Sequence, residues 1–240
     1  MKFYRALRPF KAISFDLDDT LYDNHPVMKK AEADFITHLN VTYPELAELT
    51  SHQWGLYKKH LAIEFPALKE DVSLWRIEIL KRIMVIFGIV EYKAIEFAQD
   101  ALAEFLRLRS NFTVPKSSFD LLATLAEHYP VIAITNGNVD TDKINLSDKF
   151  QFILKAGDGL NAKPEGDLFI KAARILDIEV SDILHIGDHL ISDVYGAENN
   201  GAQAIWFNEH DLPLTDAKTL PSVEISNVEL LIPLLLQKDQ

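Results

Sequence analysis

Hydrophobic positions divide this chain into two kinds of segment. Short, nearly unbroken apolar runs occupy residues 12–17, 131–135, 150–154, 182–186 and 203–207. Runs without polar alternation indicate strands buried on both faces. Stretches with a helical period lie between the later runs, at residues 118–128, 165–177 and 191–199. Alternation of such strands and helices predicts an α/β fold with a doubly wound, Rossmann-like parallel sheet.

The region between the first and second strands has a different period. Apolar residues there recur three or four positions apart, which is typical of amphipathic helices. The faces are Met28, Ala31, Phe35 and Leu39; Val72, Trp75, Ile79, Ile83 and Ile86; and Tyr92, Ile95, Ala98, Leu102 and Phe105. With a weaker segment after Pro44, four helices are expected. Residues 24–109 are therefore predicted to form an inserted all-helical cap domain, and residues 1–23 and 110–240 the α/β core.

Composition restricts the classes of function. The 240 residues are 48% hydrophobic and carry a net charge of −12, without a run of five basic residues. This argues against nucleic acid and anionic membrane as partners. There is no cysteine, so disulfides, thiolate catalysis and cysteine-bound zinc are excluded. Neither a signal peptide nor an apolar run of membrane-spanning length is present. We expect a soluble cytoplasmic protein, either a monomer or a weak homodimer.

Three predicted strands end in polar residues. The sequences are "SFDLDDT" at 14–20, "AITNGN" at 133–138 and "HIGDHLISD" at 185–193. Parallel strands place their carboxyl ends at one edge of a sheet, where ligands bind. A fourth segment, "AKPEGD" at 162–167, contains Lys163 directly before Pro164, a residue that suits the first position of a helix. We expect all four segments to meet at one site.

The residue types at this edge suit phosphoryl transfer. Asp16, Asp18 and Asp188 would bring three carboxylates together, which requires a cation, and oxygen ligands favour Mg²⁺. The hydroxyl of Thr135, the backbone amides at Asn136 and Gly137, and the ammonium of Lys163 would bind an anion opposite the metal. One aspartate would attack phosphorus, and the other would move the proton.

These segments resemble the four motifs of the haloacid dehalogenase-like (HAD) superfamily. "DLDDT", "TNG", the lysine of "KP" and "GDHLISD" occur in the order of that superfamily. The helical insertion resembles the cap of its first subclass. Within the superfamily, the chain is similar to bacterial phosphatases that act on flavin mononucleotide and on 5-amino-6-(5-phospho-D-ribitylamino)uracil, an intermediate of riboflavin synthesis.

The resemblance assigns a role to each motif residue. It implies that Asp16 is the nucleophile and a Mg²⁺ ligand, and that Asp18 is the general acid and base and binds the metal through its backbone carbonyl. It further implies phosphate binding by Thr135 and Lys163, metal ligation by Asp188, and support of the metal site by Asp193. His189 departs from the pattern, because many members carry a small residue or another aspartate there.

Other interpretations remain to be weighed. A haloacid dehalogenase of the same fold needs an aspartate nucleophile but neither metal nor second acid. A receiver-type signalling module also phosphorylates an aspartate, but it has no room for a large helical insertion. Other sugar-phosphate or nucleotide phosphatases of the superfamily are further alternatives. "GDGLNA" at 157–162 fits a dinucleotide-binding pattern, although Lys163-Pro164 delays the helix that such a site needs.

Several polar residues have a structural and a functional interpretation. His185 and His189 have the spacing of a zinc pair, but they straddle a strand and a turn, so ligation is not expected. Asp19 and Asp23 are expected to be turn or cap residues. Arg76 and Arg109, in the helical region, either contact a substrate or pair with nearby acids, and the sequence does not choose between them.

Overall fold

The α/β part of the protein is built on a seven-stranded sheet. The computed structural model describes residues 1–66, 68 and 71–236. The strand order is β1-β7-β6-β5-β2-β3-β4, and every pair is parallel except β1 with β7. The strands are β1 (Lys2–Phe3), β2 (Ala12–Phe15), β3 (Val131–Thr135), β4 (Ile153–Lys155), β5 (Ile183–Gly187), β6 (Gln203–Phe207) and β7 (Val223–Ile225).

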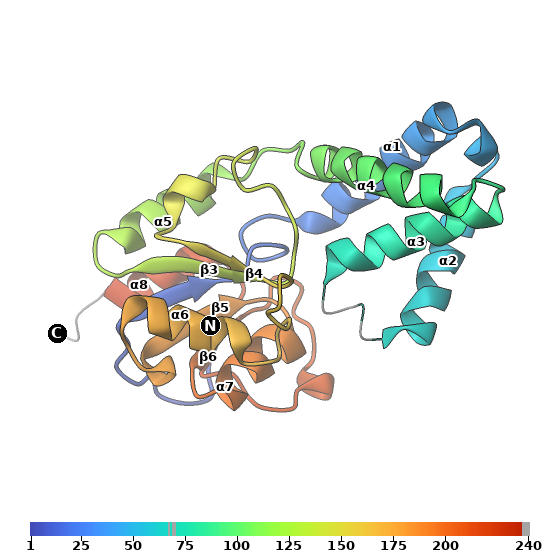
Figure 1. Ribbon diagram of the computed structural model, residues 1–240. Coiled ribbons are helices and arrows are strands. Elements are labelled where there is room, and N and C mark those ends of the chain that lie inside the picture. Colours follow the sequence, from blue (N-terminus) through green and yellow to red (C-terminus); the bar gives the residue numbers. More distant parts are fainter. Residues whose placement is uncertain (67, 69–70, 237–240) are drawn as a thin grey trace. The chain divides into compact units, whose positions relative to one another are not determined.

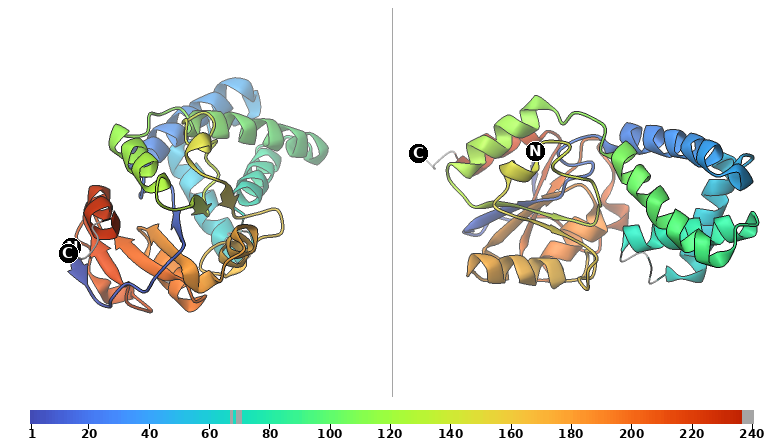
Figure 2. Two further views of the ribbon diagram at one scale, coloured as in Figure 1. Left: turned by 90° about the vertical axis from the view of Figure 1, so that its left-hand side faces the viewer. Right: turned by 45° about the horizontal axis from the view of Figure 1, so that its top comes forward.

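Helices cover both faces of this sheet. They are α5 (Lys116–Ala126), α6 (Asp167–Leu176), α7 (Gly196–Asn199) and α8 (Leu231–Leu236). In Figures 1 and 2, α5 and α8 lie over one face, and α6 and α7 lie over the other. Ile132 and Ile134 of β3 and Trp206 of β6 pack with Phe169 of α6 and Ala197 of α7 in one buried cluster. This arrangement confirms the predicted doubly wound α/β fold.

The apolar runs located most strands well. β3 and β6 coincide with the predicted residues, and β5 is shifted by one residue, from 182–186 to Ile183–Gly187. β4 begins three residues later than expected and ends at Lys155. The short strands β1 and β7 were not predicted, since two or three residues give too little periodicity to detect.

Four long helices follow β2 and make a separate apolar core. They are α1 (Asn24–Thr42), α2 (Ser51–Glu64), α3 (Val72–Ile86) and α4 (Glu91–Arg109). Side-chain caps fix two of their starts. Thr50 and Gln53 form a reciprocal capping box at α2, and Asp71 accepts from the backbone N–H groups of Ser73 and Leu74 at α3. These capped ends separate the helices without glycine or proline at every turn.

The buried faces of two helices differ from the expected ones. Ile86 of α3 is exposed, as are Tyr92 and Ile95 of α4. The residues that α4 buries are Ala94, Ala98, Ala101, Phe105 and Arg109. This face is built largely from alanines, which allow α3 and α4 to pack closely. The predicted face of α4 was therefore right at Ala98 and Phe105 and wrong at Tyr92 and Ile95.

Contacts divide the chain into two compact units. The first, the α/β unit, contains residues 1–23, 113–137 and 145–240; the second, the helical unit, contains residues 24–112 and 138–144. The predicted core included residues 138–144, which instead pack with the helices. The reason is local hydrogen bonding: Asn138 binds the side chains of Arg109 and Ser73, and the N–H of Asp140 donates to Ser110 Oγ.

Other short elements connect these parts. The 3₁₀ helices are Pro44–Leu46, Ser147–Lys149, Val180–Asp182, Leu214–Asp216 and Val228–Leu230, and Leu190–Tyr195 is a π-helix. No described helix combines the length and the apolar character needed to cross a membrane.

Candidate active site

Three neighbouring strands end at the candidate site. β2 lies between β3 and β5, so the residues after β2 are flanked by Thr135 at the end of β3 and by Asp188 after β5. The N–H of Asp16 donates to Ile186 O at 2.8 Å, which continues the ladder between β2 and β5. The sheet therefore places Asp16 in the middle of the group.

Lys163 is a buried ammonium at the centre of this group. Its Nζ donates to Asp16 Oδ1 at 2.7 Å, to Asp193 Oδ1 at 2.5 Å and to the carbonyl of Ile134 at 2.7 Å. The side chain is 1% exposed. Three acceptors satisfy the three donors of an ammonium group. Lys163 thus fixes the two carboxylates relative to β3.

The backbone of Lys163 is held by Asn136. Its N–H donates to Asn136 Oδ1 and its carbonyl accepts from Asn136 Nδ2, both at 2.8 Å. Both the oxygen and the nitrogen of the Asn136 side-chain amide therefore hold the backbone of Lys163. The same contacts correct the expectation that Pro164 begins a helix. They tie this peptide to the β3 loop, and α6 starts only at Asp167.

A second group of oxygens could hold a metal ion. Carboxylate oxygens of Asp16, Asp188 and Asp193 all lie within 4.8 Å of one another. Asp18 stands beside this cluster, half-buried, and accepts a hydrogen bond from the hydroxyl of Tyr22 at 2.7 Å. The carboxylates expected from the sequence are therefore close together, and they contain only hard oxygen donors.

Burial and close spacing shift the pKa values of the acids in this cluster. Burial, with the negative charges of Asp193 and Asp18, raises the pKa of Asp16 to about 7 although Lys163 opposes the shift. Burial, with the charges of Asp193 and Asp16, raises the pKa of Asp188 to about 8. Burial would also raise the pKa of Asp193, but Lys163 and His185 hold it below its ordinary value. One ammonium is too little positive charge for these carboxylates.

The turn after β5 requires a glycine. A Cβ on Gly187 would overlap the carboxylate of Asp193. That carboxylate also accepts from the N–H of His189 at 2.9 Å, inside the turn that leads into the π-helix. The close approach of Asp193 to the backbone explains why a glycine precedes Asp188.

Some supporting residues were not found from the sequence. Ser14 Oγ lies 2.8 Å from His185 Nδ1, and His185 Nε2 lies 3.1 Å from Asp193 Oδ1, all fully buried. Burial, with the charge of Lys163, lowers the pKa of His185 to about 4, so the ring is neutral. Trp206 Nε1 donates to the carbonyl of Asp188 at 2.6 Å. The available signal was a polar residue, Ser14 or His185, inside each of two apolar strands.

Two alternative sites are not supported. The glycine turn "GDGLNA" closes on itself through two hydrogen bonds between Gly157 and Leu160, and α6 begins several residues later. A dinucleotide site needs a helix that starts in the turn. His185 binds Ser14 and Asp193, and His189 Nδ1 accepts from the N–H of Ser192. Within the described part of the chain, the only potential metal cluster contains no histidine.

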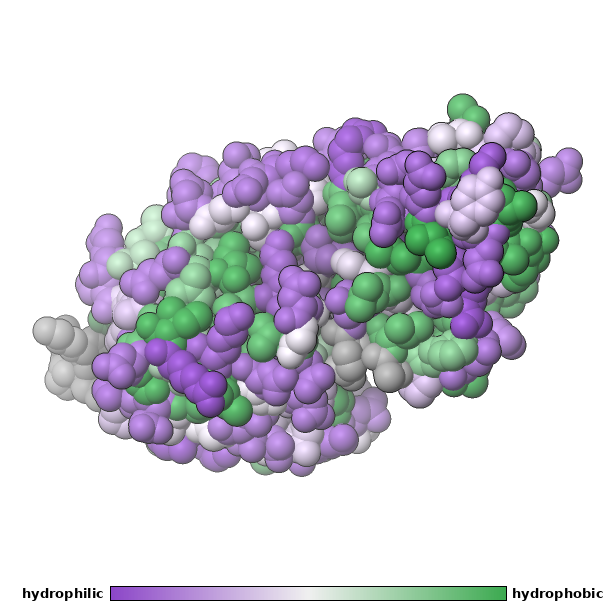
Figure 3. Space-filling view, in the orientation of Figure 1, coloured by the Kyte–Doolittle hydropathy of each residue, from purple (hydrophilic) through white to green (hydrophobic). Residues whose placement is uncertain are grey.

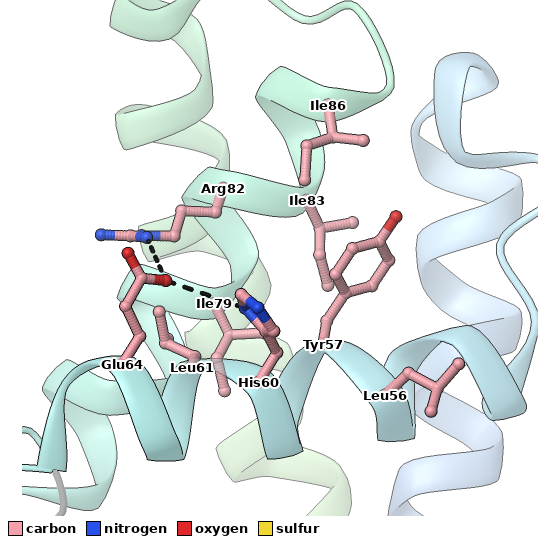
Figure 4. Close-up of a pocket in the computed structure, with 9 residues that line it drawn as sticks. All are labelled: Leu56, Tyr57, His60, Leu61, Glu64, Ile79, Arg82, Ile83 and Ile86. Carbon is pink, nitrogen blue, oxygen red and sulfur yellow. Dashed lines mark hydrogen bonds and ion pairs between the residues drawn. The ribbon is translucent and has the colours of Figure 1, made fainter.

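The helical unit has a cavity that is lined mainly by apolar side chains. It has a volume of about 510 Å³ between α2 and α3 (Figure 4). Its lining includes Leu56, Ile79 and Ile83, and its charged groups pair with one another: Glu64 lies 3.3 Å from Arg82 and 3.7 Å from His60. Apolar patches also interrupt the polar surface of this unit in Figure 3. The cavity contains none of the site residues predicted from the sequence.

Comparison with known proteins agrees with the geometry of the site. The family model of haloacid dehalogenase-like hydrolases matches residues 10–201, which include every site residue predicted from the sequence. This chain belongs to the haloacid dehalogenase-like hydrolases. The family predicted from the four motifs is thereby confirmed, and the sheet edge that holds Asp16, Lys163 and Asp188 is the part of the fold in which those motifs meet.

Individual relatives include phosphatases. The chain is 36% identical to the 5-amino-6-(5-phospho-D-ribitylamino)uracil phosphatase YigB of Escherichia coli, with 98% of this chain and 100% of that protein covered. It is 27% identical to the glyceraldehyde 3-phosphate phosphatase of Pyrococcus furiosus, with 84% and 82% covered. A solved structure named 2-haloacid dehalogenase, from Pseudomonas syringae, superposes with a TM-score of 0.85 at 32% identity, with 94% and 98% covered. The chain is an enzyme, a phosphoric monoester hydrolase.

Proposed function

We propose that this protein is a Mg²⁺-dependent phosphatase that hydrolyses a small phosphorylated metabolite through an aspartyl-phosphate intermediate. The observation that carries the proposal is the placement of Lys163 between Asp16 and Asp193 at 2.7 and 2.5 Å. This ammonium orients the nucleophile and supplies positive charge where a phosphoryl group would bind.

The first step transfers the phosphoryl group to Asp16. A carboxylate oxygen of Asp16 attacks phosphorus, and the bond from phosphorus to the alcohol oxygen breaks. Asp18, as the protonated acid, gives its proton to the departing oxygen. Thr135 contributes through its hydroxyl, and Asn136 places Lys163, so that the non-bridging oxygens meet hydrogen-bond donors.

The second step frees the enzyme. Asp18, now a carboxylate, takes a proton from a water molecule, which attacks the phosphorus of the aspartyl-phosphate. The bond between phosphorus and Asp16 breaks, and inorganic phosphate leaves. The contact between Asp18 and the Tyr22 hydroxyl fixes the orientation of the carboxylate for both proton transfers.

The donor set suits Mg²⁺. Asp16 and Asp188 would bind the ion directly, Asp18 through its main-chain carbonyl, and Asp193 would support the site because its oxygens already bind Lys163, His185 and the His189 N–H. The raised pKa values of Asp16 and Asp188 fit this assignment, since a divalent cation would compensate the crowded charge. When bound, Mg²⁺ would neutralise charge on the phosphoryl oxygens.

Flavin mononucleotide and 5-amino-6-(5-phospho-D-ribitylamino)uracil are the substrates we propose. Support comes from the name of the Escherichia coli relative and from the near-complete coverage of both chains at 36% identity. Both compounds carry a ribityl phosphate, so the reacting group is a primary phosphate monoester in either case.

Dehalogenation is a second candidate because of the Pseudomonas syringae structure. A halide leaves carbon without needing a proton, so that reaction has no use for a second acid. Asp18, placed by Tyr22 beside the nucleophile, and the oxygen cluster at Asp188 favour the phosphatase. Release of chloride from 2-chloropropionate, measured beside release of phosphate, distinguishes the two reactions.

The experiment is a screen of phosphorylated metabolites, including both proposed substrates, with Mg²⁺ and with a chelator. We expect phosphate release that requires Mg²⁺ and is lost in Asp16→Asn. Asp23→Asn is the matched control, because Asp23 is an exposed aspartate of the same segment, and it should retain activity. Phosphate release by Asp16→Asn at the parent rate would contradict the mechanism, and equal rates in chelator would contradict the metal assignment.

A further inference from the structure

Arg76 is a buried cation in the helical unit whose donors are incompletely used. The residue is 6% exposed, and its Nε and Nη1 have no hydrogen-bond partner among the described residues. Its guanidinium stacks on the ring of Phe105, 3.3 Å from the centroid, and lies 5.9 Å from that of Trp54. Glu32 approaches Nη2 only to 4.0 Å, and its nearer oxygen also binds Lys58. The charge of Arg76 is therefore only partly compensated.

A second buried guanidinium, that of Arg109 at the end of α4, is linked through Asn138 to the same face of α3. Arg109 is 3% exposed and donates from Nη1 to Asn138 Oδ1, and Asn138 Nδ2 donates to Ser73 Oγ at 3.0 Å. Ser73 and Arg76 are three residues apart on α3, so their side chains share one face. Burial, together with the charge of Arg109, lowers the pKa of Arg76 to about 10, although Glu32 opposes the shift.

The unpartnered atoms of Arg76 and of neighbouring Trp54 are donors. Besides Nε and Nη1 of Arg76, the indole Nε1 of Trp54 is buried without a partner among the described residues. A buried donor without an acceptor destabilises the folded protein, and a charged one does so more strongly. The missing partner must therefore supply acceptors. A planar guanidinium is best matched by an anion that presents two oxygens.

We propose that Arg76, with Arg109 beside it, binds a carboxylate or phosphate group of an organic anion. All of these residues belong to the helical unit, and none of them is part of the aspartate and lysine cluster. The ligand is a free organic anion that carries a carboxylate or a phosphate group. Both groups present two oxygens to a guanidinium, and the experiment tells them apart.

The test follows the Nε–H resonance of Arg76 in the full-length ¹⁵N-labelled protein. Arg76→Lys assigns the resonance. Citrate is the carboxylate probe, and methylphosphonate, whose phosphorus–carbon bond resists hydrolysis, is the probe for a phosphate group. We expect a saturable shift of the Arg76 resonance with at least one probe. A shift with citrate alone identifies a carboxylate site, and a shift with methylphosphonate identifies a site that accepts phosphate. No shift with either probe, which means that water alone occupies the donors, would overturn the proposal.

Binding to variants gives an independent measurement. Arg76→Met keeps the stacked stem but removes the donors, and we expect it to weaken binding of the active probe by about tenfold or more. Arg107→Met is the control, because Arg107 is exposed and its charge is paired with Glu104. The Tm of Arg76→Met should not fall, since an under-paired buried charge is removed. Unchanged binding by Arg76→Met would refute the proposal. If this variant does not fold, the resonance titration of the parent chain decides.

The citrate titration does not depend on catalysis. If the protein released no phosphate from any ester, the proposed function would fail while the Arg76 resonance could still respond to citrate. If phosphate were released normally and the Arg76 resonance stayed unchanged with both probes, only the present inference would fail. The two outcomes are therefore distinguishable.

Discussion

At the scale of single residues, the site depends on a buried row of polar contacts. Ser14, His185, Asp193, Lys163 and Asp16 follow one another at hydrogen-bond distance. Each residue of the row holds the next in place. Residues from two strands and a loop therefore fix the orientation of Asp16 together. The row contains one ammonium for two carboxylates, and its geometry is therefore sensitive to removal of that charge.

Lys163→Met tests this dependence. We expect phosphate release to fall by about 10²–10³-fold, because a preorganised cation at the phosphoryl site is lost. The Tm should fall as well, since Asp16 and Asp193 would be left as buried carboxylates without their ammonium. Steady-state kinetics and thermal unfolding measure the two effects. Lys171→Met, at an exposed position of α6, should change neither. A variant with reduced Tm but unchanged kcat would show that Lys163 is only structural.

At the scale of elements, local sequence patterns located most strands, whereas the buried face of one helix depended on tertiary packing. The strands β3 and β6 were located from apolar runs alone, because a strand in a central parallel sheet is apolar on both faces. The buried face of α4 was located only in part: Ala98 and Phe105 were predicted, but Ala94 and Ala101 were not. Small residues carry little hydrophobic signal, yet they allow close helix packing. Such a face becomes visible only when the partner helix is known.

Two glycines of the helical unit should respond in opposite directions to alanine. Gly55 lies inside α2, and a Cβ there would meet no atom within 4 Å. Gly55→Ala should therefore stabilise the protein by about 0.5–1 kcal/mol, through the lower backbone entropy of the unfolded chain. Gly88, which follows α3, has a φ of +97°, so Gly88→Ala should destabilise it by about 1 kcal/mol or more. Denaturant unfolding measures both, and equal effects would contradict the argument.

The edge formed by β1 and β7 should respond to pH. Glu224 of β7 accepts from Lys2 at 2.8 Å, from Tyr4 at 2.6 Å and from Asn208 at 3.1 Å. Burial would raise its pKa, but these donors lower it below the ordinary 4.5. The unfolded state therefore binds the proton more readily. The stabilisation from Glu224 is present above about pH 4.5 and is lost as the pH falls through the native pKa.

Glu224→Gln checks this sign. The variant should unfold at a lower temperature than the parent at pH 7, and the difference should shrink as the pH is lowered below about 4.5. Thermal unfolding followed by circular dichroism across this range is the measurement. Glu229→Gln, at an exposed residue near the chain's end, serves as the control. A difference that grows toward low pH would show that the sign is wrong.

At the scale of the whole molecule, charge balance is the dominant constraint. The chain carries a net charge of −12, and its candidate site concentrates three carboxylates within 4.8 Å of one another. Mutual repulsion and burial of these carboxylates destabilise the folded state, and Lys163 compensates only part of their charge. A divalent cation that binds only the folded state would shift the unfolding equilibrium by mass action.

Mg²⁺ should therefore raise the Tm of the protein. At a concentration about 100 times the Kd, the expected stabilisation is about 2.7 kcal/mol. Asp188→Asn should unfold at a higher temperature than the parent without metal, because one crowded charge is removed, and should respond little to Mg²⁺. Thermal unfolding against Mg²⁺ concentration measures both. An equal Mg²⁺ response in parent and Asp188→Asn would exclude Asp188 as a ligand.

The sequence by itself determined the fold class and the chemical parts of the site. Apolar runs identify buried strands, and the polar residues at their ends must converge because parallel strands share a carboxyl edge. Asp16, Thr135 and Asp188 could be selected on this basis, and Lys163 from its place directly before Pro164. Only the tertiary structure decided that Asn136 holds Lys163 and that His185 supports Asp193. It also decided that residues 138–144 pack with the helices and that Arg76 is buried with unused donors. These features depend on hydrogen bonds and packing between segments far apart in the chain, and no local pattern of residues encodes which partner a buried polar group will find.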